Sequence, residues 1–421
     1  MTTDAAVFEN FHLVHPDHYA EHGYPHPVWT RLRREDPVHY FDRTEGMPFW
    51  AITRHEDIVA IGRDPDRFRN GPRIVVDHQP ERPNDFPPTL IQLDPPKHGI
   101  YRKLVNKRFT PGRLRHLHAD IERIAKEIVD SLDAGGGEGE CDFVEKVSAP
   151  LPIAVIAWLL GVPREDWRLL FEWTNRTIGA QDPDFRAEGK SSLESAEAAM
   201  AELFGYFAKL VEEKRKNPAD DLVTLFSQLE VDGERIPEVD VLAWCLIIVI
   251  AGNETTRNAT SGGMLALVEH PDELRKLQAN PALLPSEVEE IVRWTSPIIH
   301  FARTAAEDCE VRGRKIRKGD VLALFYPSAN RDEEIFEDPF VFRVDRKPNH
   351  HLAFGVGEHY CLGAHLARLE LEFAYKHLLP RFEEVELAGP VSRLHSALVG
   401  GVKHLPIRYR LKPADAVAAA S

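Results

Sequence analysis

Cysteine is scarce in this chain of 421 residues, and long apolar segments are lacking. The chain has four cysteines, and their spacing is not that of a zinc site or a disulfide framework: Cys141, Cys245, Cys309 and Cys361. Such a pattern fits a reducing compartment. The longest apolar run, residues 241–252, is too short to span a bilayer, and residues 1–10 lack the apolar core of a signal peptide. We therefore expect a cytoplasmic protein with no membrane span.

Positive charge is also in short supply. The chain has 52 Lys and Arg against 67 Asp and Glu, a formal net charge of −15, which argues against nucleic acid as a general partner. One stretch departs from this balance, because only basic charges occur in it before Asp120: Arg102, Lys103, Lys107, Arg108, Arg113 and Arg115. This basic run is either a solvated helix face or a docking patch for an acidic partner.

Several fingerprints are missing too. The chain has no internal repeat, no glycine-rich dinucleotide motif for a flavin or a nicotinamide, and no cysteine cluster for an iron–sulfur centre. Any electrons that its chemistry needs must therefore come from another protein. With 43% apolar and 28% charged residues, the composition is that of a globular protein that buries a large core.

Most of the chain has the periodicity of amphipathic helices, and three regions read as rich in strands, roughly residues 35–70, 298–330 and 385–410. Within the first of them, residues 37–41 are expected to pair with residues 49–52. Within the second, residues 311–326 read as a hairpin.

The expected turn of that hairpin is residues 317–320, and Leu398 to Gly401 read as a further strand turn. Residues 71–93 form a long loop rich in proline and charge, of a kind that is usually functional. Its apolar residues favour a lid over a pocket: Ile74, Val75, Phe86, Leu90 and Ile91. The alanine-rich tail, residues 414–421, is expected to be disordered.

The most distinctive stretch is a glycine-punctuated loop, residues 354–363, with one cysteine near its end. Apolar residues recur at helical spacing directly after it, so Cys361 should lie at or just before a helix N-terminus. The unpaired N–H groups and the helix dipole there favour an anion and lower the pKa of a thiol. Gly357 and Gly363 would let a large flat group approach the sulfur closely. The alternative is an ordinary buried cysteine in a tight turn.

A second stretch, Val241 to Thr256, is an apolar helix that runs into polar residues without a turn. Polar side chains inside a buried helix are costly unless they are partnered, and Gly252 weakens the helix by about 1 kcal/mol relative to Ala. We expect a disturbed hydrogen-bond ladder here, with room for a ligand or water. Ala251 and Thr255 share a face, while Glu254 is rotated by about 100° and could face a water channel. The alternative is a helix end whose polar residues reach solvent.

Two further pairs have helical spacing. His98 and Arg102 are four residues apart, so these cationic donors can clamp a pair of carboxylates. We expect Asp94 to cap the same helix. Glu290 and Arg293 are three residues apart and can form an ion pair. Either pair alone is equally typical of a solvated helix face.

Together these segments resemble the cytochrome P-450 superfamily. Phe-x-x-Gly-x-His-x-Cys-x-Gly at residues 354–363 is similar to its haem-binding loop, and Ala-Gly-x-Glu-Thr-Thr at residues 251–256 is similar to its oxygen-binding segment. Glu-x-x-Arg at residues 290–293 resembles a buried structural pair that a second arginine joins. That arginine matches Arg346, in a motif where Arg343 replaces the usual Asp, which leaves the packing of this loop open.

The resemblance covers about residues 20–410. It is strongest to soluble bacterial members that act on terpenoids and steroids, because of Asp-Pro-Pro-x-His at residues 94–98 and Phe-x-Arg-Thr-Ala at residues 301–305. It implies a single domain over residues 1–421 with the cytochrome P-450 fold. That fold is mainly α (α+β), a triangular helical prism with a smaller β-rich region.

The resemblance also implies how the site works. The Cys361 thiolate would bind the iron of haem b and donate electron density that favours O–O cleavage. O₂ would bind on the opposite haem face, in the groove at Ala251 and Gly252. Thr255 would form a hydrogen bond to the oxygen, and Glu254 would relay protons from solvent.

The remaining site residues are expected as follows. The haem propionates would be held by His98, Arg102, Arg303 and His359. The loop against the haem would include Phe354, Gly357 and Gly363. The structural triad would consist of Glu290, Arg293 and Arg346. An apolar substrate pocket would be lined by Ile74, Ile91, Ile247, Ile248, Ile298, Ile299, Leu398 and Val399. A redox partner would dock at Lys103, Lys107, Arg108 and Arg113.

The expected reaction is insertion of one atom of O₂ into a C–H bond of a hydrophobic terpenoid, steroid or fatty-acid-like molecule. Electrons would come from NAD(P)H through an acidic iron–sulfur ferredoxin and its reductase, and we expect a monomer. Three alternatives stay open. A peroxide-driven or non-hydroxylating haem-thiolate enzyme would use the same cysteine. A non-catalytic haem module would not need Glu254 and Thr255, and a haem-free cysteine nucleophile would leave His98 and Arg303 unexplained.

Overall fold

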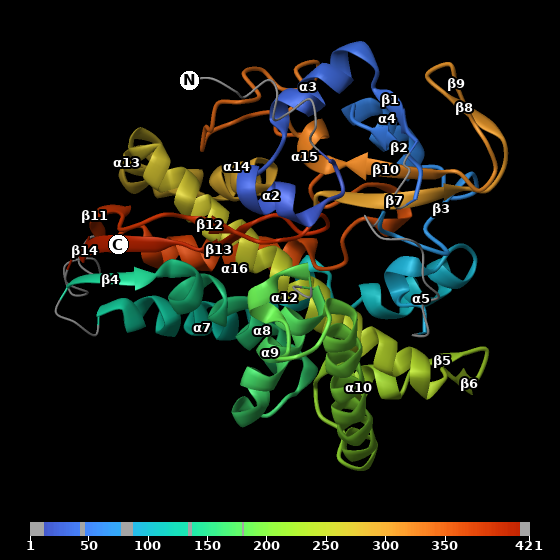
Figure 1. Ribbon diagram of the computed structural model, residues 1–421. Coiled ribbons are helices and arrows are strands. Elements are labelled where there is room, and N and C mark those ends of the chain that lie inside the picture. Colours follow the sequence, from blue (N-terminus) through green and yellow to red (C-terminus); the bar gives the residue numbers. More distant parts are fainter. Residues whose placement is uncertain (1–11, 43–46, 77–86, 134–136, 179–180, 413–421) are drawn as a thin grey trace.

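Helices make up most of the molecule, and the strands form several separate sheets, the largest of them on one side of the fold (Figure 1). The computed structural model describes residues 12–42, 47–76, 87–133, 137–178 and 181–412. The predicted fold class, a mainly helical prism with a smaller β-rich part, is confirmed. The predicted disorder of residues 414–421, and the Phe86 part of the proposed lid, lie outside the described residues.

One long helix, α12 (Glu238–Glu269), runs through the middle of the molecule (Figure 1). By length and composition it could cross a membrane, but 61% of its most apolar window is buried inside the protein. It packs against α8 (Pro150–Leu160), α9 (Trp167–Ile178), α14 (Leu284–Thr295) and α16 (Ala364–Leu378). An α-helix that is apolar on nearly every face needs such a surround, so α12 is the core helix of the fold.

The other helices surround this centre. They are α2 (Pro16–His22), α3 (His26–Glu35), α4 (His55–Gly62), α5 (Lys97–Asn106), α6 (Pro111–Leu114), α7 (His118–Asp130), α10 (Ser192–Lys216), α11 (Leu222–Ser227), α13 (Pro271–Ala279) and α15 (Tyr326–Ala329). Single turns of tighter or wider helix connect them: η1 (Leu90–Gln92), η2 (Arg115–Leu117), η3 (Ser131–Asp133), η4 (Val144–Ser148), η5 (Arg164–Asp166), η7 (Pro183–Phe185), η8 (Pro281–Leu283) and η9 (Gly357–His359).

The largest sheet has five strands in the order β1-β2-β10-β7-β3. Their bounds are β1 (Val38–Phe41), β2 (Phe49–Ile52), β3 (Phe68–Arg69), β7 (His300–Ala305) and β10 (Val321–Phe325). The predicted pairing of the first two strands is confirmed, since Val38 lies opposite Ile52 and Phe41 opposite Phe49. The sheet carries Arg303 on β7 toward the site described below.

The hairpin that the sequence predicted at residues 311–326 forms elsewhere. It consists of β8 (Cys309–Val311) and β9 (Arg314–Ile316), which turn at Arg312 and Gly313. Both turn residues have positive φ, 48° and 76°, as tight hairpin turns require. Residues 317–320 instead lead into β10, which pairs with β7 and β2 in the large sheet.

Smaller sheets complete the fold. One has the order β11-β14-β4, with β11 (Phe382–Leu387), β14 (Pro406–Leu411) and β4 (Glu138–Asp142). The remaining pairs are β12 (Ser392–Arg393) with β13 (Val402–His404), and β5 (Glu230–Val231) with β6 (Glu234–Arg235). Strand β4 was not predicted, because its Glu, Gly and Asp residues are depleted in strands. Backbone pairing with β14 holds it in place.

The glycine pair near the C-terminal end brings the last turn onto the core. The Gly400 N–H donates to the Pro297 carbonyl at 2.8 Å. A Cβ atom on Gly400 would overlap the Tyr24 hydroxyl, and one on Gly401 would overlap Asn258 of α12. Only glycine therefore fits, and residues 398–401 come to lie beside residues 297–299.

Candidate active site

The loop that contains Cys361, residues 354–363 and here called the cysteine loop, ends at a helix, as predicted. Helix α16 begins at Ala364, and Gly363 is its N-terminal cap. The Cys361 N–H donates to the Phe354 carbonyl at 2.9 Å, which closes the loop on itself. The backbone N–H of Gly363 donates to the Cys361 sulfur. The sulfur is therefore held at a fixed position at the start of α16.

The electrostatics of this thiol differ from the prediction. Burial raises the pKa of Cys361 overall, although the Gly363 N–H and the charges of Arg102 and Arg368 lower it. The predicted net lowering of the pKa is therefore wrong for the protein alone. The side chain is nevertheless accessible at its surface. An exposed residue whose thiol is nevertheless desolvated by surrounding protein lies in a recess, which a large ligand can enter.

The two glycines of the loop, Gly357 and Gly363, have different surroundings. Gly357 has a φ of 78°, and a Cβ atom there would overlap the carbonyl oxygen of Gly62 in α4. It serves the contact between the loop and α4, rather than the approach of a flat group. A Cβ on Gly363 would meet nothing within 4 Å. The side of Cys361 next to Gly363 is therefore open.

The predicted propionate-binding residues converge from three segments. His98 and Arg102 lie on one face of α5. The His98 ring stacks on His359 of the cysteine loop, with 3.9 Å between ring centres and 24° between planes, and Arg102 donates to the Tyr360 carbonyl. Burial, together with the positive charges of His98, Arg303 and Arg102, lowers the pKa of His359 to about 2. Burial and the charge of Arg102 also lower the pKa of His98, so both imidazoles are neutral at neutral pH, and Arg102 and Arg303 supply the positive charge in this small volume.

Their free donor positions fit an anion. Among the described residues, neither ring nitrogen of His98 nor Nε2 of His359 has a hydrogen-bond partner, although all three atoms are buried. The nearest carboxylate, Glu358, has its oxygen 3.7 Å from Nδ1 of His98. Buried polar atoms are normally paired. A group that carries carboxylates, such as haem with its two propionates, would satisfy this cluster.

Helix α12 is unbroken where it passes the site, at residues 251–255. Thr255 donates from its hydroxyl to the Ala251 carbonyl at 2.8 Å, and α12 continues as an α-helix through Gly252. The predicted disturbance of the helix is therefore wrong. Gly252 is needed because a Cβ atom there would lie 2.6 Å from Ile156 of α8. Ala251 is exposed in the middle of this buried helix, which indicates open space on the face that it shares with Thr255.

Glu254 does not reach solvent. It is 1% exposed and forms an ion pair with Arg257, one turn further along α12. Burial raises the pKa of its carboxyl, and Arg257 opposes that rise. The prediction that Glu254 faces a water channel is therefore not met in this structure. The role of Arg257 was not predicted, although its i, i+3 spacing from Glu254 is typical of a helical ion pair.

The Glu-x-x-Arg pair forms a buried triad with the arginine before the cysteine loop. Arg293 donates to both oxygens of Glu290 at 2.7 and 2.8 Å, and Arg346 donates to both at 3.1 Å. The unusual Arg343 contributes its backbone N–H, which donates to Glu290 at 3.0 Å. The missing Asp of the family motif is therefore no obstacle to the packing of this loop.

A second group of ion pairs, a brace between the cysteine loop and two helices, was not predicted. Arg368 on α16 donates to both oxygens of Glu289 on α14, at 2.5 and 3.0 Å. His351, just before the cysteine loop, lies 2.9 Å from the same carboxylate. These three residues lock the loop between two helices. Arg368 follows Cys361 by seven residues, on a helix that the sequence did predict, but nothing in its own spacing pointed to Glu289.

The expected pocket residues separate into two groups. Six are partly accessible inside the fold: Ile74, Ile91, Ile247, Ile248, Ile298 and Leu398. Ile299 and Val399 are buried, at 0% and 1% exposure. Successive strand residues point to opposite faces, so Ile299 packs in the core of the large sheet instead of lining a pocket. Asp94 also differs from its expected role, because it accepts the N–H groups of Asn70 and Gly71.

The residues of the basic run differ in exposure and in ion pairing. Lys103 and Lys107 are exposed and have no ion-pair partner in the described part of the chain. Arg108 lies 2.7 Å from Asp220, which already neutralises it. The side chain of Arg113 lies outside the described residues. Arg102, the neighbour of Lys103 on α5, contacts the cysteine loop, and Lys107 directly follows the last residue of this helix.

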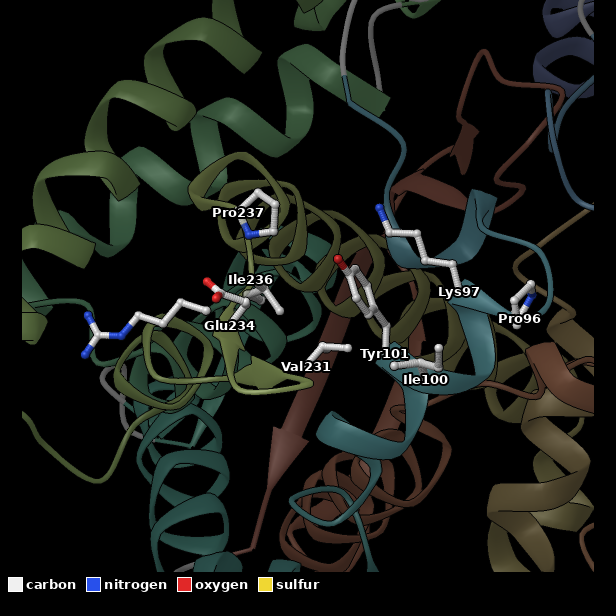
Figure 2. Close-up of a pocket in the computed structure, with 9 residues that line it drawn as sticks. Pro96, Lys97, Ile100, Tyr101, Val231, Glu234, Ile236 and Pro237 are labelled. Atoms are coloured by element: carbon white, nitrogen blue, oxygen red, sulfur yellow. The ribbon is translucent and has the colours of Figure 1, made fainter.

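A surface groove lies on another face of α5 (Figure 2). Its volume is about 450 Å³, and it is lined by Pro96, Lys97, Ile100, Tyr101, Val231, Glu234, Arg235, Ile236 and Pro237. The Tyr101 hydroxyl donates to Asp240 at 2.6 Å at the edge of this groove. His98 and Arg102 are turned toward the cysteine loop, so the groove is separate from the site around Cys361.

Fold and site together are those expected of a haem-thiolate protein: one cysteine at a helix start, a cluster of His and Arg donors beside it, and a central helix with an open face. The chain belongs to the cytochrome P-450 family, whose profile matches residues 43–396. Membership implies haem and the use of O₂, and the chain is a cytochrome P-450 monooxygenase. The recognised resemblance to bacterial members is thereby confirmed.

Curated relatives agree over nearly the whole chain. The methyl-branched lipid omega-hydroxylase of Mycobacterium tuberculosis is 36% identical over 390 residues, 91% of this chain and 90% of the relative. The steroid C26-monooxygenase of the same species is 37% identical, covering 95% and 92%. The linalool 8-monooxygenase of Pseudomonas putida is 35% identical, covering 94% and 98%. The crystal structure of a family member from Novosphingobium aromaticivorans superposes with a TM-score of 0.86 at 36% identity, covering 96% of this chain and 98% of that one.

Proposed function

We propose that this enzyme hydroxylates a hydrophobic terpenoid, steroid or lipid at a methyl group that ends a branched hydrocarbon chain. The names of two relatives place oxidation at a chain end: the omega carbon of a methyl-branched lipid and C26 of a steroid. Six of the aliphatic side chains expected to line the pocket are partly accessible, which suits such a chain. The single observation that carries the proposal is the open, aliphatic-flanked face of α12 at Ala251 and Thr255.

The residues of the chain have distinct parts in this proposal. Bound haem supplies the oxygen-activating chemistry, and thiolate donation from Cys361 tunes it. The cationic cluster around His98 and His359 holds the propionates and so fixes the orientation of the ring. The hydroxyl of Thr255 holds a proton at the open face of α12. After that proton is transferred, Glu254, on another face of the same helix, supplies the next one.

Electrons must come from a separate protein. We infer an acidic iron–sulfur ferredoxin and its reductase, which draw on NAD(P)H in the cytoplasm. Lys103 and Lys107 are exposed positive charges of an acidic protein and have no ion-pair partner among the described residues, so they are the candidates for docking. We also infer that the enzyme acts as a monomer, and that nucleic acid is not among its partners.

The test is reconstituted turnover. The haem-loaded enzyme is mixed with a ferredoxin, a ferredoxin reductase and NADPH, and is offered matched pairs of substrates: iso-branched and straight-chain fatty acids, and sterols with and without the side chain. The expected product is a primary alcohol at the branched end, formed at least about tenfold faster than from the straight chain.

Equal rates for both members of each pair, or oxidation on the ring system, would overturn the chain-end proposal. Product that forms with hydrogen peroxide but never with ferredoxin and NADPH would favour the peroxide-driven alternative over a ferredoxin-dependent one.

A further inference from the structure

A buried polar network lies behind Glu254, on the side of α12 away from Ala251. Arg257 holds its centre: one arm of the guanidinium donates to Glu254, and the other donates to Asn175 of α9 at 3.0 Å. Phe185, in the turn after α9, lies with its ring centre 5.9 Å from the guanidinium carbon. All three polar side chains are buried. The arginine is therefore fixed from two helices.

Several polar atoms of this network have no partner among the described residues. They are Oε1 of Glu254, Nε of Arg257, Oδ1 of Asn253 and Oδ1 of Asn258. A cluster of unpaired buried polar atoms is costly in a tightly packed core, and such clusters are the places where proteins hold water. One oxygen of Glu254 thus remains available to exchange a proton, while Arg257 holds the other.

The charges around Glu254 come from few sources. Arg257 is the charged group that acts on its carboxyl within the described part of the chain. On α9, Asn175 and Thr174 are neutral, and Arg176 is engaged by Glu202 of α10. On β13, Lys403 is engaged by Asp182 and Asp184. The protonation of Glu254 therefore depends on burial and on this one arginine.

We propose that Arg257 is a positioning residue for the reaction: anchored by Asn175, it holds Glu254 in the buried site and decides at which pH that carboxyl gives up its proton. The inference rests on the proposed proton-relay role of Glu254. Burial favours the neutral acid, and the guanidinium favours the carboxylate. A carboxyl under two opposed influences can both take up and release a proton, which is what a relay needs.

The test measures the protonation of Glu254 directly. Difference infrared spectra of the haem-loaded enzyme are recorded across pH, and the carboxyl C=O band of Glu254 is assigned by its loss in Glu254→Gln. Arg257→Gln should move the midpoint of this band to higher pH by about one unit or more, a tenfold change in proton affinity. Arg257→Lys, which keeps the charge but not the fork, should recover part of the shift. Asn175→Ala should give a smaller upward shift, because it frees one arm of the arginine.

Arg33 provides the control. It is equally buried and forms an ion pair with Glu333, and it is not among the charges that act on Glu254, so Arg33→Lys should lower stability without moving the band. An unchanged midpoint in Arg257→Gln would overturn the proposal. If that variant does not fold, an unchanged midpoint in Asn175→Ala would do the same. A band that shifts while the pH profile of turnover stays constant would leave the positioning role intact and remove Glu254 from the proton relay.

Discussion

The guanidinium carbon of Arg368 lies 4.4 Å from the centre of the Phe354 ring, while its fork binds Glu289 on α14. One side chain of α16 thus covers the first residue of the cysteine loop and ties it to a neighbouring helix. Burial alone would raise the pKa of Glu289, but hydrogen bonds from His351 and Arg368 hold it down at about 2. The carboxylate stays charged at neutral pH, and the brace persists.

We expect Arg368→Gln to loosen this brace. The pair is partly exposed, so the loss should be about 1–3 kcal/mol of unfolding free energy, with faster loss of haem at raised temperature. Urea unfolding and the decay of the Soret band measure the two effects. Arg123→Gln serves as the comparison, because Arg123 pairs with Glu127 on an exposed helix face and its loss should cost less than about 0.5 kcal/mol. Equal effects of the two variants would contradict the bracing role.

Cys361 is predicted to be the iron ligand. The purified protein should be red, and its ferrous–CO complex should show the red-shifted Soret band that thiolate donation produces. Cys361→Ser should abolish this band. Cys309→Ser is the matched control, since Cys309 lies on β8 in the outer hairpin, and it should leave the band in place. A Cys361→Ala protein that keeps the red-shifted band would remove the central assignment.

Thr255 is predicted to couple electron use to product formation. Its hydroxyl bonds to the Ala251 carbonyl at the open face of α12. Thr255→Ala should bind substrate normally but form about tenfold less product for each NADPH consumed, with the balance as peroxide. Thr255→Ser retains a hydroxyl and should recover most of the yield. If Thr255→Ala gave the wild-type yield, proton delivery would have to use another group.

The sequence was enough to predict the contacts that are local or that follow helical spacing. His98 and Arg102 share a face because they are four residues apart, and Glu290 meets Arg293 for a similar reason. The position of Cys361 at the start of α16 followed from the apolar period after it. The hairpin at residues 37–52 followed from strand-forming residues on both sides of a polar turn.

Contacts between segments that are distant in the sequence could not be predicted from helical spacing or local patterns. Gly357 is needed because of Gly62, almost three hundred residues earlier, and Gly252 because of Ile156 on α8. No period in the sequence encodes such a meeting of two backbones or of a backbone and a side chain. The prediction that the pKa of Cys361 is lowered was wrong for a related reason. A helix terminus can be recognised in the sequence, whereas the burial that outweighs its effect cannot.

Lys103 and Lys107 give a prediction about electron transfer. Lys103→Gln together with Lys107→Gln should slow reduction by the ferredoxin about threefold to tenfold at low salt, because unpaired charges steer the encounter. The effect should vanish at high salt, where charges are screened over a few ångströms. Arg108→Gln should change little, since Asp220 already neutralises that side chain. Stopped-flow reduction at several ionic strengths measures all three. Identical salt slopes for the double variant and the wild type would show that this face is only solvated.

Glu370 on α16 gives a prediction about pH and stability. It is 1% exposed, one of its oxygens has no hydrogen-bond partner among the described residues, and burial raises the pKa of its carboxyl to about 8. The folded state therefore binds this proton more tightly than the unfolded state does. The stabilising effect of the proton is complete below the unfolded pKa, near 4.5, and it is lost as pH rises through about 8.

Glu370→Gln, which is neutral at every pH, should remove this loss. Its unfolding free energy should exceed that of the wild type above pH 8 by roughly 2–5 kcal/mol, and the difference should shrink toward pH 5. Urea unfolding at several pH values measures it. Glu287 on α14 is also buried with a raised pKa, so the variant should keep part of the alkaline decline, and Glu287→Gln in the same background should reduce the remainder. A difference between wild type and Glu370→Gln that does not vary with pH would mean that Glu370 is not protonated in the folded protein.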